Sequence, residues 1–362
     1  MPDGSTYVAC DRLGAFTAAV FVRLGLSSED AAEVARCLLT ADLRGIGSHG
    51  VSRVPIYAER LRRGLVNPTP SLRVERTGSA VAVVDGDNGM GAVVGTRAMA
   101  EAIALAGAHG AAAVAARHGN HYGIASYYAM QALEHDCIGL ALTNTAPAMA
   151  PWGGREAFLG TNPLAAAAPA GAHPAIVLDM ATSVAARGKI RLAAQRGEPI
   201  PEGWALDAAG APTTDAAKAM AGVILPFAGP KGSALALLVE ILSGVLSGAA
   251  VGPAVGSQYT DFDRRQDVGH FFVVLDVARF MPVAEFKGRM DAMIAALKAG
   301  APAKGHREVL LPGDIERATA ERRRRTGVPL SREIVAALGE LSEGLGVPFP
   351  DTSPEPLADG RR

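Results

Sequence analysis

The feature that most constrains the fold of this chain is a succession of short apolar segments between residues 73 and 280. Runs of roughly four to eight apolar residues bounded by Gly, Pro or Asn are typical of strands in a buried sheet. The predicted strands cover residues 73–78, 80–89, 112–117, 137–144, 163–170, 175–183 and 270–280. The helical patterns between them cover 93–107, 124–135, 183–196 and 230–248. This alternation predicts a mixed α/β fold for the middle of the chain and leaves the strand order open.

Both ends of the chain are predicted to be helical. Residues 27–45 open with Ser27 and Ser28 followed by two acidic residues, which is typical of a helix N-terminus. A further helix is expected over 51–64, and more helix after Pro312. The 362 residues suffice for a large buried core, and we expect the two helical ends to pack together. The three expected parts are an N-terminal helical segment, 1–75, a central α/β region, 76–300, and a C-terminal helical segment, 301–362.

Composition excludes several classes of protein. The chain has 35 Lys and Arg against 36 Asp and Glu, so it lacks the basic surplus usual for proteins that bind nucleic acid or anionic membranes. Its three cysteines lie far apart in the sequence, which predicts reduced thiols in the cytoplasm. No basic stretch followed by an apolar run opens the sequence, so no secretory signal is expected. Segment 233–252 is apolar, but Glu240 in its middle favours a buried helix over a membrane span.

Searches for common site motifs give negative results. In GDNGMGAVVG, residues 86–95, the glycine that should follow Gly89 and Gly91 at position 94 comes one residue late, so the Rossmann fingerprint fails. A phosphate-binding G-x-x-x-x-G-K-[ST] and a G-x-S-x-G are also missing. His118 and His121 are three residues apart without a carboxylate beside them, so we expect no metal site.

Polar residues gather instead in four segments rich in glycine and proline. Such residues either line a pocket or satisfy their own turns, and for each segment taken alone both readings stay open. The residues are Asp42, Arg44, Ser48, His49 and Arg53; Asn120 and His121; Thr143, Asn144, Thr145, Thr161 and Asn162; and Asp179, Thr182, Ser183 and Lys189. If a helix begins near residue 49, His49 and Arg53 share one face and can address one small ligand.

Several stretches from about residue 10 to residue 350 together carry a resemblance to a known family. They are ADLRG-x-x-SHGVSR, HGNHYG, TNTAPAMAPWGGREAFLGTNPLA, VLDMATSVAARGKI, GEPIPEGWALDAAGAPTTD, GPKGSALALLVEILSGVLSG, GHFFVVLDV and LPGD. In order and spacing they resemble the type-2 malate/L-lactate dehydrogenases. The resemblance implies a non-Rossmann fold with a mainly antiparallel central sheet, and a homodimer. It also implies hydride transfer between NAD or NADP and C2 of a small 2-hydroxy or 2-oxo acid such as malate or lactate.

The resemblance also implies roles for individual residues. Reduction of a 2-oxo acid requires a proton donor and a cation for the substrate carboxylate. We favour His49 as the acid/base, oriented by Ser48 and Asp179, with His121 as the competing candidate. Arg53 matches the carboxylate-binding arginine, and Thr161 is expected as a second substrate contact.

A larger set of residues matches the family's cofactor-binding positions. It consists of His121, Tyr122, Gly123, Ile124, Ala125, Thr145, Asp179, Met180, Ala181, Arg187, Gly188, Lys231, Gly313 and Asp314. Ile46 and Gly47 depart from the family pattern beside the expected acid, and Ser233 and Ala234 depart from it after Lys231. The alternatives are a reductase of a cyclic imine acid, a dehydrogenase of ureidoglycolate-type substrates, a dinucleotide-binding homologue without activity, and a structural oligomer without a ligand.

Overall fold

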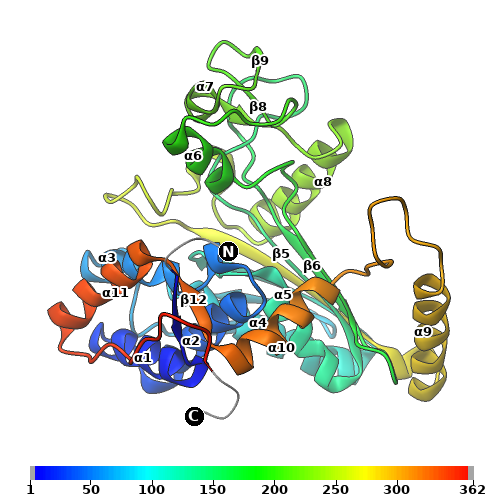
Figure 1. Cartoon of the computed structure of the whole chain (residues 1–362). Coiled ribbons are helices and arrows are strands. Elements are labelled where there is room, and N and C mark those ends of the chain that lie inside the picture. The colour runs from blue at the N-terminus through cyan, green and yellow to red at the C-terminus, as the bar shows by residue number, and fades with distance from the viewer. Residues whose placement is uncertain (1–4, 358–362) are drawn as a thin grey trace.

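A seven-stranded sheet forms the centre of the computed structural model, which describes residues 5–357 (Figure 1). Its strands, in spatial order, are β2 (Arg73–Arg76), β3 (Val81–Asp85), β4 (Ala111–Gly119), β11 (Val268–Asp276), β5 (Cys137–Thr143), β6 (Leu164–Ala168) and β7 (Ile176–Met180). Only β3 and β4 pair in parallel within this sheet, and the other neighbours are antiparallel. The expectation of a mixed α/β fold with a mainly antiparallel central sheet is confirmed.

The two faces of the sheet are covered by different helices. Successive side chains of a strand point to opposite faces, and in β11 Phe272 belongs to the large core whereas Phe271 packs near Val239 of the opposite layer. The first layer contains α4 (Gly91–His109), α5 (Ala125–Ala129) and the 3₁₀ segment η3 (Met130–His135). The second contains α8 (Pro230–Glu240) and the π-helical turn η4 (Ile241–Val245).

The apolar helix over 230–248 differs from its prediction in two ways. The α-helix ends at Glu240 and continues as the π-helical turn, which passes so close to β11 that a Cβ on Gly269 would lie 1.7 Å from the Ser243 carbonyl oxygen. The helix is also not buried all round, since Leu237 is 50% and Val245 61% exposed. Within residues 5–357, no helix has the length and apolar character needed to cross a membrane.

The N-terminal helices and the C-terminal helix α11 (Arg332–Leu345) lie side by side at the lower left of Figure 1. β1 (Thr6–Val8) pairs antiparallel with β12 (Val328–Leu330), and neither strand was anticipated from the sequence. Ser27 caps its helix as expected, because its hydroxyl accepts a hydrogen bond from the Asp30 N–H. The helices here are α1 (Cys10–Arg23), α2 (Ser28–Leu43), α3 (Val54–Arg62), α10 (Asp314–Thr326) and α11 (Arg332–Leu345).

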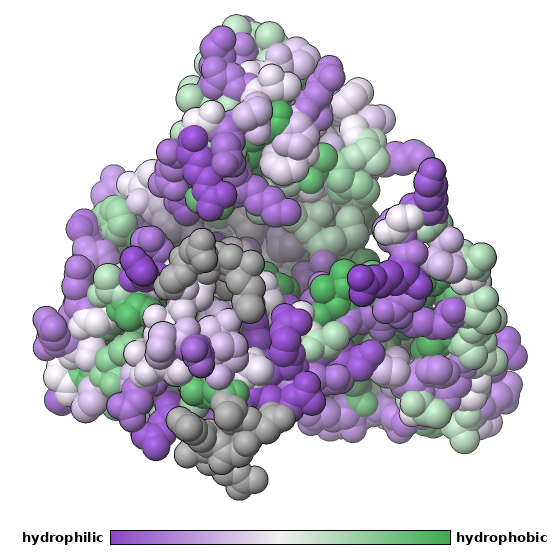
Figure 2. All heavy atoms as spheres, viewed as in Figure 1, coloured by the Kyte–Doolittle hydropathy of each residue, from purple (hydrophilic) through white to green (hydrophobic). Residues whose placement is uncertain are grey.

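A separate lobe stands above the sheet in Figure 1 and has its own small core, which includes Met149, Leu159 and Ile190. It contains α6 (Arg187–Arg196), α7 (Ala216–Ala221) and a small sheet of β8 (Ala205–Leu206), β9 (Pro212–Thr213) and β10 (Val223–Ile224). The remaining elements are α9 (Val283–Lys298), which was not predicted, and the 3₁₀ turns η5 (Gly252–Ala254) and η6 (Val277–Arg279). Figure 2 shows the surface recessed between this lobe and the body below it.

Candidate active site

The turn that follows α2 is built around a buried aspartate. The Asp42 carboxylate accepts a hydrogen bond from the Val51 N–H at 2.7 Å, and a Cβ on Gly50 would lie only 2.0 Å from that carboxylate. Glycine is therefore required at position 50. Burial raises the pKa of Asp42 to about 7, while the Val51 N–H and the Arg323 charge oppose this rise. Asp42 thus fixes the backbone turn at Gly50, which lies between His49 and Arg53.

His49 and Arg53 do not lie on one continuous helix, contrary to the simplest expectation from their spacing. They belong to two 3₁₀ turns, η1 (Gly47–His49) and η2 (Val51–Arg53), which extended backbone at Gly50 separates. The two side chains nevertheless lie close enough for the Arg53 charge to lower the pKa of His49. The structure therefore brings this predicted pair together by a different local geometry.

Two histidines from distant parts of the chain meet next to Arg53. The rings of His49 and His121 are stacked with centroids 5.5 Å apart, and the Tyr57 hydroxyl lies 2.6 Å from His121 Nδ1. Burial, and to a smaller extent the charge of Arg53, lowers the pKa of His49 to about 3 and that of His121 well below its ordinary value. Both imidazoles are therefore neutral at pH 7 in this structure.

The hydrogen bonds of His121 indicate which ring nitrogen carries its proton. The Gly123 N–H points at Nδ1 from 3.3 Å, and a backbone amide can only donate. Nδ1 is then the acceptor, so the proton of the neutral ring lies on Nε2. His49 is less constrained, because its Nδ1 faces the hydroxyl of exposed Ser48 at 2.9 Å, which can donate or accept.

Arg53 is a half-buried cation without a counter-ion. Within residues 5–357, no hydrogen bond or ion pair reaches its guanidinium, and its Nε is buried without a partner. The ring of Tyr259 lies 5.4 Å from the guanidinium carbon. Burial lowers the pKa of Arg53, and the charge of Arg191 on α6 lowers it further. A half-buried cation in this setting is suited to an anionic ligand.

Asp179 lies at the end of β7, as predicted, but its hydrogen bond goes elsewhere than to His49. Its carboxylate accepts from the Ser126 N–H at 2.9 Å. Burial raises the pKa of Asp179, while Ser126 and the Arg44 charge oppose the rise. β7 is the last strand of the sheet, so among the described residues the outer backbone edge from Asp179 to Ala181 has no neighbouring strand, whereas Ser183 forms a bridge to Pro226.

The threonines and asparagines of the third polar segment form a network around the buried side chain of Glu240, which is 1% exposed. Glu240 accepts from Asn162 Nδ2 at 2.7 Å, from the Gly252 N–H at 2.8 Å and from Asn144 Nδ2 at 3.3 Å. These two asparagines therefore hold loops together. Thr145 accepts from the Thr161 N–H at 3.0 Å, which places these two predicted contacts beside each other.

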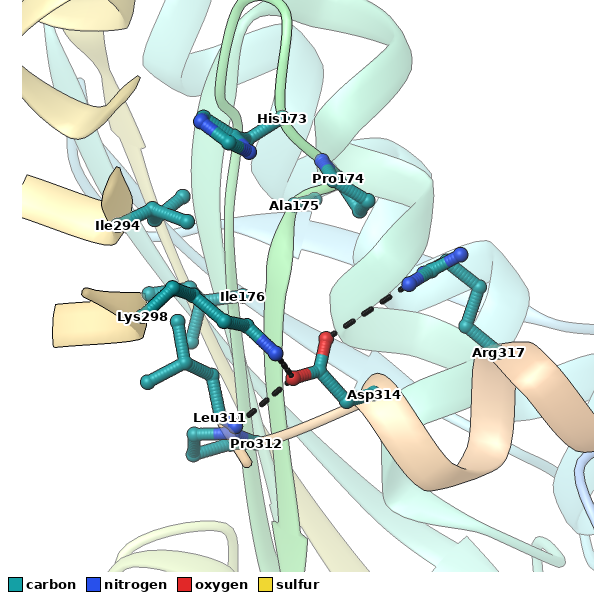
Figure 3. Close-up of a pocket in the computed structure, with 10 residues that line it drawn as sticks. All are labelled: His173, Pro174, Ala175, Ile176, Ile294, Lys298, Leu311, Pro312, Asp314 and Arg317. Carbon is teal, nitrogen blue, oxygen red and sulfur yellow. Dashed lines mark hydrogen bonds and ion pairs between the residues drawn. The ribbon is translucent and has the colours of Figure 1, made fainter. Parts of the chain in front are cut away.

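The Gly313–Asp314 turn packs against Val177 of β7, and Asp314 lines a pocket of about 240 Å³. Figure 3 shows the Asp314 side chain directed at Lys298 and Arg317. Its carboxylate accepts from Lys298 Nζ and, at 2.9 Å, from the Leu311 N–H. A ligand at this turn would therefore meet the backbone of Gly313 more readily than the Asp314 carboxylate.

Three further predicted cofactor residues lie at helix starts. Lys231 is exposed in the first turn of α8, and no ion pair engages it in the described part of the chain. Arg187 and Gly188 are exposed at the start of α6. Ser233, one of the departures from the family pattern, is buried and accepts from the Trp152 N–H at 3.0 Å, so it ties α8 to a neighbouring loop.

Three residues of the site were not found from the sequence. Tyr57 lies four residues after Arg53, one helical turn, and this spacing was its signal. Tyr259 and Gln266 reach the site from more than a hundred residues away, and their sequence carries no comparable signal. Among residues 5–357, no three or more His, Cys, Asp or Glu side chains are grouped so as to hold a metal ion.

Comparisons with known proteins identify relatives of this chain. A family model described as malate/L-lactate dehydrogenase matches residues 8–339. The chain is 42% identical to the L-sulfolactate dehydrogenase of Methanocaldococcus jannaschii, over 92% of this chain and 95% of that protein. The solved structure of the sulfolactate dehydrogenase from the same organism superimposes with a TM-score of 0.90 at 41% identity, covering 95% of this chain and 98% of that one.

Two further relatives carry other substrate names. The malate dehydrogenase of Pyrococcus horikoshii is 41% identical over 93% of this chain and 95% of its own length. A protein of Escherichia coli O157:H7 named ureidoglycolate dehydrogenase (NAD(+)) is 39% identical over 80% of this chain and 82% of its own length.

Proposed function

The chain belongs to the malate/L-lactate dehydrogenase family, and from this premise we propose which of its residues bind the substrate and move the proton. It is an oxidoreductase that acts with NAD or NADP on small 2-hydroxy or 2-oxo acids. One observation supports this assignment of residues most directly. Two neutral histidines lie next to Arg53, whose guanidinium has no hydrogen-bonding partner among residues 5–357.

Arg53 binds the substrate carboxylate. Its planar guanidinium can donate two parallel N–H bonds to a carboxylate, which fixes the orientation of C2 as well as its position. Thr161 lies beside Thr145 and serves as a second substrate contact.

His121 moves the proton at the substrate oxygen. In the empty site the neutral ring carries its proton on Nε2, and the Gly123 N–H and Tyr57 hold Nδ1 in place. Uptake of a second proton at Nδ1, next to the Tyr57 hydroxyl at 2.6 Å, gives the imidazolium, which passes its Nε2 proton to the substrate oxygen and keeps the proton on Nδ1. The sequence alone favoured His49, oriented by Ser48 and Asp179, whereas the hydrogen bonds favour His121. His49 then packs against the His121 ring, and Asp179 positions the start of α5 through Ser126.

Substrate binding favours protonation of this site. The Arg53 charge depresses the pKa of both histidines, and a carboxylate on Arg53 offsets that charge. A bound 2-oxo acid therefore raises the pKa of His121 and promotes proton uptake where a proton is needed.

Two features support the binding of a dinucleotide by the residues expected to hold the cofactor. In the described part of the chain, the outer backbone edge of β7 is open from Asp179 to Ala181, and Lys231 offers a cation without an ion pair for a phosphate. When bound, the nicotinamide supplies or accepts the hydride at C2. The residues that we propose to hold NAD or NADP are His121, Tyr122, Gly123, Ile124, Ala125, Thr145, Asp179, Met180, Ala181, Arg187, Gly188, Lys231, Gly313 and Asp314.

Among substrates, we favour acids that carry a second acidic group, such as malate or sulfolactate. Two relatives at 42% and 41% identity are named for sulfolactate and malate, and Arg191 supplies a second cation, whose charge lowers the pKa of Arg53. Ureidoglycolate-type substrates and cyclic imine acids are the alternatives.

The test is the change in absorbance at 340 nm with NADH or NADPH and a panel of 2-oxo acids and cyclic imine acids. We expect oxidation of the cofactor with a 2-oxo dianion. Folded protein that oxidises neither cofactor with any substrate would contradict the assignment, and binding of a cofactor without turnover would favour an inactive homologue.

We further propose a cytoplasmic homodimer with the three parts 1–75, 76–300 and 301–362. The exposed apolar residues of α8 and η4, Leu237, Leu238, Ile241 and Val245, support contact with a second copy. The three free cysteines are consistent with a reducing compartment. The mass in solution by light scattering tests the dimer.

A further inference from the structure

One long loop, residues 257–267, runs from η5 to the start of β11 and contacts both halves of the candidate site. We refer to it as the strap. In Figure 1 it belongs to the yellow segment that extends toward α3.

The strap is anchored to α3 by a buried arginine. Arg60 is 1% exposed and donates hydrogen bonds to the carbonyl oxygens of Asp261 at 2.8 Å, Arg264 at 3.2 Å and Ser257 at 3.5 Å. A buried guanidinium is costly unless acceptors surround it, so these carbonyls and Arg60 hold each other in place. Within the strap, the Asp261 carboxylate also accepts from the Arg264 side chain and from the Ser257 N–H.

The anchored strap reaches the site at two points. Tyr259 places its ring 5.4 Å from the guanidinium carbon of Arg53. Gln266, which is buried, accepts a hydrogen bond from the His121 N–H at 3.2 Å. The strap therefore touches both the residue that we assign to the carboxylate and the residue that we assign to the proton.

We propose that Tyr259 is a positioning residue for Arg53, held over it by the Arg60 anchor; this inference rests on the proposed function. An aromatic ring against the face of a guanidinium attracts its positive charge and leaves the N–H groups in its plane free. Those N–H groups are the ones that a carboxylate uses. Tyr259 thus fixes the plane in which Arg53 presents its donors.

The same strap supplies a matched control. Phe262 lies 4.4 Å from the guanidinium carbon of Arg63, so it makes the same kind of contact three residues further along. Arg63 already pairs with Glu59 at 2.6 Å and has no role in the proposed site. Removing the Phe262 ring therefore tests the strap without touching Arg53.

The experiment compares KM and kcat of the full chain with Tyr259→Ala, Tyr259→Phe and Phe262→Ala, using a 2-oxo acid that the wild type reduces. We expect Tyr259→Ala to raise KM about fivefold to tenfold while kcat changes less than about threefold, because only the binding of the carboxylate is weakened. Tyr259→Phe keeps the ring and should retain the wild-type KM, as should Phe262→Ala. An equal KM for Tyr259→Ala and Phe262→Ala would overturn the proposal.

Binding of oxalate, measured by calorimetry on the same variants, separates this inference from the proposed function. Oxalate presents a carboxylate to Arg53 and requires no turnover. Tyr259→Ala should weaken oxalate about fivefold to tenfold, whether or not any 2-oxo acid is reduced. If the wild type reduces no 2-oxo acid but this loss is seen, only the proposed function is wrong. If oxalate binds Tyr259→Ala as tightly as the wild type, the role of Tyr259 is wrong.

Discussion

Two polar clusters of this molecule contrast sharply, although in the sequence both are polar residues among glycines and prolines. Around Glu240, the two carboxylate oxygens receive hydrogen bonds from Asn144, Asn162 and Gly252. Around Arg53, the guanidinium has no hydrogen-bonding partner among residues 5–357, and two neutral histidines lie beside it.

Whether the buried polar groups have partners distinguishes a structural cluster from a functional one. Buried polar groups that satisfy one another stabilise the fold. A half-buried cation that lacks a partner leaves binding capacity for a ligand. The Glu240 carboxylate therefore holds the loops together, whereas we propose that the Arg53 cation binds the substrate.

The largest expected difference between the two clusters is the loss of kcat in His121→Ala. The variant should lower kcat by about a thousandfold with little change in stability, since a positioned general acid contributes roughly a hundredfold to ten-thousandfold. The control is His118→Ala, which removes an imidazole three residues away that pairs with Asp85. If His49→Ala lowers kcat more than His121→Ala does, the proton belongs to His49.

At Glu240 we expect a substitution to lower stability and to leave kcat nearly unchanged. Glu240→Ala leaves three donors without their acceptor and should lower the free energy of unfolding by about 3 kcal/mol. Chemical denaturation measures this loss, and the folded fraction should keep kcat within about threefold of the wild type. A large loss of kcat with unchanged stability would place Glu240 in the catalytic machinery and remove the contrast.

A smaller effect is expected for Arg53→Lys. Lysine keeps the charge but loses the planar pair of donors, so KM for the 2-oxo acid should rise about tenfold while kcat changes little. Arg63→Lys, on an arginine of the same region that pairs with Glu59, is the control. An unchanged KM would argue against anchoring of the carboxylate by Arg53.

The smallest effect is a pH dependence of anion binding. In the empty site burial, followed by the charge of Arg53, holds the pKa of His121 low, and a carboxylate on Arg53 offsets part of this. The complex then binds more protons than the free protein, so oxalate affinity should fall as pH rises through the pKa of the complex. Calorimetry should find binding about threefold tighter at pH 6 than at pH 8. Affinity independent of pH would contradict this coupling.

Local elements were predictable because their signals are local. Ser27 and the acidic residues after it mark the start of α2, and the apolar runs mark strands β4 to β7 and β11. The π-helical turn after Glu240 was not predictable, since its cause is the close approach of Ser243 to Gly269 on a strand of distant sequence. The strands β1 and β12 are three residues each and exist only because the two chain ends meet.

The residues of the candidate site were largely predictable from the sequence, whereas their hydrogen-bond partners were less so. His49, Arg53 and His121 were identified, but Ser126 as the partner of Asp179 required the folded chain. Tyr259 and Gln266 escaped detection because a long loop brings them to the site. Contacts between residues far apart in sequence leave no spacing to read in a single chain.

The most direct test of the central claim is transfer of deuterium from NADH or NADPH that carries two deuterium atoms at C4. The wild-type chain should place one deuterium at C2 of the 2-hydroxy acid, as detected by mass spectrometry and NMR of the product. His121→Ala should form this product much more slowly, with the label still at C2. A product without deuterium at C2, or no product from any 2-oxo acid, would contradict the account.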